Sequence, residues 1–147
     1  MFANLNHHVK SLYILVALLM CSYGCHFEEI TTRHSTYASA VDGNILRKGW
    51  IPEEIVFDSM TDIFLRTNPS TNEAIFYFKL SERHMLDLEN ILERDTIQTE
   101  LKTRINTPRW WKRGIKEKME NRYKYKDNTA VVYFYLNKDQ KEIFGWR

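Results

Sequence analysis

The sequence is poor in the residues that usually mark a catalytic or cofactor site. Its five glycines form no cluster, so no glycine-rich phosphate loop is expected. No serine lies in a Gly-x-Ser-x-Gly elbow or in a Ser-x-x-Lys pair. Beyond residue 24 the histidines are His26, His34 and His84, whose spacing fits no metal signature. We therefore expect no cofactor, no metal and no serine-based enzyme.

Charge of one sign and long apolar runs are also missing. The formal net charge is +2, and removal of residues 1–24 would take away Lys10 and no acid, leaving 20 bases and 19 acids. This balance argues against nucleic acid as a partner. A membrane-spanning helix needs roughly 20 apolar residues, whereas the run from Leu12 to Met20 reaches about half of that length. A permanent transmembrane anchor is therefore the weaker alternative.

The first 24 residues have the order of a signal peptide. Lys10 precedes the apolar run, and the small residues Ser22 and Gly24 follow it. Removal of this segment would leave 123 of the 147 residues, enough for one ordinary domain. With 44% apolar and 14% aromatic residues, the chain has the material for a core.

Cysteine is almost absent, which singles out Cys25. Cys21 and Cys25 are the two cysteines of the chain, so cleavage between them leaves one thiol in an oxidising compartment. The segment Ser22-Tyr23-Gly24-Cys25 resembles a bacterial lipobox, although Ser22 and Tyr23 depart from the usual residues. The resemblance implies that Cys25 is acylated and anchors the protein to a membrane. Ordinary secretion with a free Cys25, or a Cys21–Cys25 disulfide in an uncleaved segment, are the alternatives.

The pattern after Cys25 predicts a tether over residues 25–33 and one α+β domain over 34–147. His26 after the acylated cysteine favours the outer membrane, facing the periplasm, by resemblance to enteric lipoproteins. Helical spacing predicts a first helix between His34 and Leu46, with Ser35 or Thr36 as the cap at its start.

Two hairpins and further helices are expected in the rest of the domain. The first hairpin pairs residues 61–66 with 73–80, and its inward-facing residues are Ala74, Phe76, Phe78 and Leu80. Ser81 caps a helix with an apolar stripe, and a charged helix is expected over residues 115–123. The second hairpin pairs 130–136 with 142–146. These elements predict a mainly antiparallel sheet built from two hairpins, with two or three helices packed on one face.

Three short segments carry a family resemblance. They are Arg47-Lys48-Gly49-Trp50-Ile51-Pro52, Ser59-Met60-Thr61-Asp62-Ile63 and Ser70-Thr71-Asn72-Glu73. In this order they resemble the pattern "RGW(I/L)P", "SATDI" and "DTNE" of small, uncharacterised bacterial lipoproteins and envelope proteins. The resemblance covers about residues 37–80 and implies no activity. Met60 and Ser70 depart from the pattern.

Five residues are candidates for a binding surface. Trp50, Asp62 and Asn72 either line a shared surface or serve structural roles, with Trp50 bracing the first helix and Asn72 satisfying backbone groups in a turn. Of Trp110 and Trp111, one is expected in the core and the other as a lid over the sheet edge. The alternative is a patch that faces a membrane or a protein partner.

The leading interpretation is a non-enzymatic envelope lipoprotein that binds a protein partner or supports an assembly. One version is an immunity or inhibitor protein that neutralises an envelope-targeting toxin. The second class is a carboxylate-dependent enzyme acting on cell-wall glycan or peptide, with acid pairs such as Asp58 and Asp62 or Glu53 and Glu54. A purely structural lipoprotein is the third.

Overall fold

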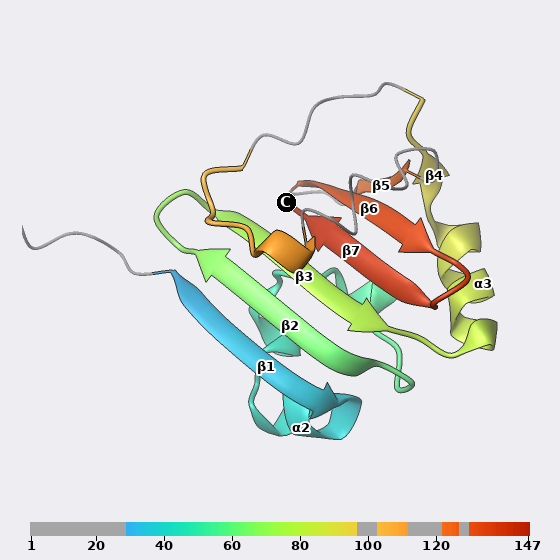
Figure 1. Ribbon diagram of the computed structural model, residues 1–147, viewed down its shortest axis with the longest axis horizontal. Helices are drawn as coiled ribbons and strands as arrows, with labels where there is room; N and C mark the ends of the chain where they lie inside the picture. Colours follow the sequence, from blue (N-terminus) through green and yellow to red (C-terminus); the bar gives the residue numbers. More distant parts are fainter. Residues whose placement is uncertain (1–28, 97–102, 112–121, 127–129) are drawn as a thin grey trace, which may run out of the picture.

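The computed structural model describes residues 29–96, 103–111, 122–126 and 130–147. In this part of the chain seven strands form one antiparallel sheet in the order β1-β2-β3-β7-β6-β5-β4 (Figure 1). The strands are β1 Ile30–Thr36, β2 Thr61–Asn68, β3 Glu73–Lys79, β4 Glu93–Arg94, β5 Arg122–Lys126, β6 Val131–Asn137 and β7 Glu142–Trp146. The α+β class and the mainly antiparallel sheet are therefore confirmed. The sheet extends beyond the two expected hairpins, because β1, β4 and β5 add to it.

The helical elements of the described residues are short. They are α2 Tyr37–Asp42, the 3-10 turns η1 Leu46–Lys48 and η2 Glu53–Ile55, and α3 Glu82–Ile91, and residues 109–111 are also helical. Thr36 and Ser39 start α2 with a capping box, in which each side chain accepts a hydrogen bond from the other residue's backbone N–H. Ser81 caps α3 as expected, because its side chain accepts from the backbone N–H of His84.

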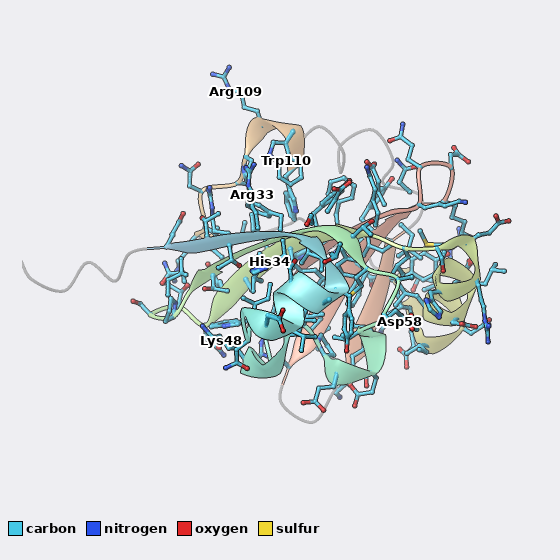
Figure 2. All side chains as sticks on the ribbon, turned by 90° about the horizontal axis from the view of Figure 1, so that it is seen from below. Arg33, His34, Lys48, Asp58, Arg109 and Trp110 are labelled. Carbon is cyan, nitrogen blue, oxygen red and sulfur yellow. The ribbon has the colours of Figure 1, made fainter. Side chains whose placement is uncertain are left out.

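The main core lies between one face of the sheet and these helical elements. The four inward-facing residues expected on β3 are all buried there, with Ala40 of α2 and with Met85 and Leu88 of α3. Figure 2 shows the sheet nearly edge-on, with α2 on one side of it. Alternation along β3 thus placed the correct set of side chains in the main core.

A second cluster covers the opposite face of the sheet. It consists of the buried residues Phe64, Ile75, Ile105, Trp111, Tyr135, Phe144 and Trp146. Ile75 was expected to face outward, but the segment that carries Ile105 and Trp111 packs over it. Both faces of the central strands are therefore covered.

Three expectations for the elements need correction. The helix expected between His34 and Leu46 starts where expected, with Thr36 as its N-cap, but its C-terminal half is wrong because α2 ends at Asp42. Ile30 to Arg33, expected in the tether, belong to β1. Most of the charged helix expected from Ile115 lies outside the described residues, but its end at Tyr123 is wrong because Tyr123 is in β5.

Candidate functional site

An open groove of about 680 Å³ lies on the sheet face opposite α2. Its walls come from β1, β2, β3, β7 and the helical turn at residue 110, and four of its side chains are aromatic. We call it the aromatic groove; its lining residues are Arg33, His34, Ser35, Asp62, Ile63, Phe64, Tyr77, Trp110, Gln140, Glu142 and Phe144. Figure 2 shows Arg33 and Trp110 on this side of the sheet, with Lys48 and Asp58 on the side of α2.

The two neighbouring tryptophans have different roles in building the groove. Trp111 is completely buried, and its indole Nε1 donates a hydrogen bond to the carbonyl oxygen of Phe76 at 3.4 Å. Trp110 remains 40% exposed, with its ring centroid 5.2 Å from that of Phe64 and 5.4 Å from that of Tyr77. Trp111 therefore anchors the turn, and Trp110 forms a wall of the groove. This is the expected division into one core residue and one lid, but the lid lies over the inner strands β2 and β3 and not over the sheet edge.

Arg33 supplies the positive charge of the groove. It lies directly opposite Phe64 in the β1–β2 register, and its guanidinium carbon is 5.4 Å from the centroid of the Phe64 ring. Arg66 approaches the same ring at 5.7 Å, but it also contacts Glu29, Thr31 and the carbonyl oxygen of Asn106. Among the described residues no acid pairs with Arg33, so its charge is open to a ligand.

Acidic residues line the groove on the side of β3 and β7. Asp62 pairs with Lys79 at 2.9 Å between Oδ2 and Nζ. The hydroxyl of Tyr77 donates to Glu142 Oε1 at 2.9 Å, and Glu142 Oε2 accepts from Asn137 Nδ2 at 3.0 Å. Burial, together with the hydrogen bond to the Glu142 carboxylate, raises the pKa of Tyr77. Tyr77 is thus a protonated donor, and both carboxylates already have partners.

A β-bulge sets the position of Asp62. The register between β2 and β3 shifts between Thr61 and Phe64, and Asp62 has a φ of 52°. Aspartate tolerates this left-handed conformation better than most residues. The bulge turns the start of β2 so that Asp62 lies at the groove and reaches Lys79.

The structure separates the residues predicted for a binding surface. Asp62 and Trp110 both line the aromatic groove. Trp50 packs against the main core on the other face, beside a cavity of about 190 Å³. Asn72 has a φ of 53° in the β2–β3 turn, at the end of the hairpin away from Asp62. Cys25 lies outside the described residues.

Of the residues that line the groove, sequence reasoning named only Asp62 and Trp110 for a binding surface. Arg33 was assigned to the tether, and Tyr77 was placed on the outward face of its strand without a role. Phe144 was placed in a strand with no partner named for it. The aromatic residue at Tyr77, alternating with a buried set, was the one available signal that this second face is covered.

Ser59, His84 and Asp58 form a polar cluster elsewhere that superficially resembles a catalytic triad. Ser59 Oγ lies 2.7 Å from His84 Nδ1, and Asp58 Oδ1 lies 3.6 Å from the same nitrogen. In a relay the acid and the nucleophile contact opposite ring nitrogens, so this arrangement does not activate Ser59. The described residues contain no group of three or more His, Cys, Asp or Glu side chains that could hold a metal ion.

Fold and groove together define a small α+β domain with an open aromatic groove on one face of its sheet. Residues 28–79 match the family model of the YbbD head domain. The match covers roughly a third of the chain, from β1 to the end of β3, and supports its relation to an uncharacterised bacterial family. It includes Arg33, Asp62 and Tyr77 but not Trp110 or Phe144. No curated protein and no solved structure matches the chain.

Proposed function

We propose that this protein is a non-enzymatic lipoprotein of the bacterial cell envelope that binds a protein partner through the aromatic groove. The proposal rests above all on Trp110, whose indole is two-fifths exposed and forms one wall of a groove shared with Tyr77, Phe144 and Arg33. Tryptophan, tyrosine and arginine are the residues that dominate binding energy at protein interfaces. An exposed cluster of this kind is unusual unless a ligand covers it.

The proposed location follows from the N-terminal segment. Acylation of Cys25 after removal of residues 1–24 would hold the domain at the outer membrane, facing the periplasm, and lipid would be its second partner. No helix among the described residues is long and apolar enough to cross a membrane.

The carboxylate-enzyme alternative has one observation in its favour, because Asp62 and Glu142 line the same groove. Each, however, is held by a partner, Asp62 by Lys79 and Glu142 by Tyr77 and Asn137. General acid–base catalysis needs a carboxyl group free to exchange its proton with a substrate. This geometry favours binding over hydrolysis.

Site-specific photo-crosslinking in cells tests the proposal. A photoreactive residue at Gln140, beside the groove, should trap one protein, and the same residue at Leu86, exposed on α3, should not. Trp110→Ala should abolish the crosslink at Gln140 without unfolding the domain. Equal products at both positions, or none, would count against partner binding at the groove, and the latter is what a purely structural lipoprotein predicts.

The anchor is tested separately on the same preparation. Mass spectrometry of the N-terminal peptide should detect an acylated Cys25, and Cys25→Ala should release the protein from the membrane fraction. An unmodified Cys25, or membrane retention of the variant, would contradict the lipoprotein assignment while leaving the groove experiment valid.

A further inference from the structure

Strand β1 is a long open edge of the sheet (Figure 1), and Arg33, His34 and Ser35 of this strand line the aromatic groove. It has seven residues, and no described strand pairs with its outer side. The opposite edge is β4, which has two residues. β1 contains no proline or lysine, residues that commonly protect edges from further pairing.

Alternation along the ladder identifies the backbone groups that β1 presents outward. The N–H of Tyr37 donates to the carbonyl of Met60 at 2.9 Å. In this register the backbone N–H and C=O groups of Arg33 bond to β2, whereas those of Thr32 and His34 point away from β2. Thr36 also points outward, but Ser39 Oγ contacts both its N–H and its carbonyl. Thr32 and His34 therefore offer two donors and two acceptors to an added strand.

The side chains of the same strand lead into the groove. Arg33 and Ser35 are two positions apart, face the groove side of the sheet and are both exposed. A strand added to β1 would place two of its own side chains, also two positions apart, beside them. Because Ser35 is small, an apolar side chain of the added strand can extend past it toward Trp110.

We propose that an extended segment of the protein partner adds to β1 as a further strand, with a carboxylate on Arg33 and an apolar side chain two residues away in the groove. The inference rests on the proposed function, since it names how the partner fills the same groove. Backbone hydrogen bonds to Thr32 and His34 supply affinity, and the two alternate side chains supply specificity.

Charge favours an acidic segment over a second copy of this chain. Full antiparallel overlap of two β1 strands, with Thr32 opposite His34, would set Arg33 directly against Arg33 of the other copy. Like charges in such a position are destabilising, whereas a carboxylate there pairs with the open guanidinium. Because the residues of β1 are neutral or basic, this edge favours a partner segment with an acidic residue.

Phage display of short random peptides tests the inference on the full-length protein. Selected peptides should carry Asp or Glu two positions from a large apolar residue. Thr32→Pro removes an outward N–H and leaves the β1–β2 hydrogen bonds intact. It should lower the affinity of the selected peptides about tenfold, as expected for a lost hydrogen bond plus poorer fit. Arg33→Glu should instead select peptides with Lys or Arg at the acidic position.

Amide hydrogen exchange of the unmodified protein guards against variants that simply misfold. A selected peptide should slow exchange at Thr32 and His34. Suppose that Trp110→Ala abolishes peptide binding, whereas Thr32→Pro leaves the affinity unchanged and the peptide does not slow exchange at Thr32 and His34. The groove then binds the peptide without strand addition, and only this inference fails. If no peptide is selected, or none depends on Trp110, this inference fails, and the crosslink at Gln140 decides whether the groove binds a partner in another way. Self-association that Thr32→Pro abolishes would make a second copy the occupant and overturn the inference.

Discussion

Gly145 is the glycine on which the main core depends most directly. It lies in β7 between Phe76 on β3 and Phe134 on β6. A Cβ at this position would lie 2.0 Å from Cε2 of Phe76. The missing side chain therefore leaves the space that the Phe76 ring occupies, stacked beside Phe78.

We predict that Gly145→Ala lowers the free energy of unfolding by about 2 kcal/mol, as overpacking of a well-filled core typically does. Urea denaturation followed by circular dichroism measures the effect. Phe76→Leu in the same chain should recover part of the loss, because a smaller side chain makes room for the methyl group. Strictly additive effects of the two substitutions would show that Phe76 is not the obstacle.

Glu89 gives stability a dependence on pH. Its Oε1 accepts hydrogen bonds from Lys138 Nζ and from the Tyr123 hydroxyl, the latter at 2.8 Å. The bond from Lys138, followed by that from Tyr123, lowers the pKa of Glu89. The contact ties α3 to β5 and to the turn that joins β6 and β7.

A lowered pKa in the folded state stabilises the protein above the unfolded pKa of about 4.3 and loses this contribution as pH falls through the folded value. We predict that wild type exceeds Glu89→Gln in unfolding free energy near neutral pH and that the difference shrinks in acid. Thermal unfolding of both proteins across this range measures it. Asp139→Asn, which replaces an acid in the same β6–β7 turn, is the control. A difference that does not change with pH would rule out the ionised contact.

At the scale of elements, capping decides where α3 begins. Ser81 Oγ accepts from the N–H of His84 at 3.3 Å. Ser81→Ala should therefore cost about 1 kcal/mol of stability, measured by urea denaturation. Ser70→Ala in the β2–β3 turn is the matched control, because Ser70 contributes its backbone N–H, not its hydroxyl, to Asn68. An equal loss in the two variants would argue that the hydroxyl of Ser81 has no capping role.

The elements that could be predicted are those with one strong pattern. The alternation of β3 and the stripe after Ser81 are both specified locally. β1 escaped prediction because an edge strand with both faces partly open has no apolar alternation. β5 reads Arg-Tyr-Lys-Tyr-Lys, and its first two residues were taken for the end of a helix although charges alternate with tyrosines along the segment.

The site could be predicted in part for the same reason. The exposed aromatic character of Trp110 was visible locally, and Asp62 stood in a recognisable segment. Their proximity depends on Phe64, Tyr77 and Phe144, which come from three strands whose order only the folded sheet defines. Arg33 joins them through the β1–β2 register, which no local pattern specifies.

At the scale of the whole molecule, the two clusters are opposite faces of the same strands. Ile75 of β3 is buried in the second cluster, and its neighbour Phe76 is buried in the main core. Unfolding of a strand that contributes to both clusters therefore disrupts both of them. The described domain is therefore expected to unfold as one cooperative unit.

Replacing the two tryptophans in turn tests this expectation. Trp111→Ala removes a fully buried indole and should cost about 4 kcal/mol, whereas Trp110→Ala, at a partly exposed position, should cost about 1 kcal/mol. Because the clusters share strands, Trp111→Ala should lower the urea midpoint of the whole domain, with circular dichroism and tryptophan fluorescence changing together. Separate transitions would instead mean that the segment carrying Ile105 and Trp111 detaches from the sheet while the main core stays folded. The groove wall formed by Trp110 could then move independently of the rest of the proposed binding site.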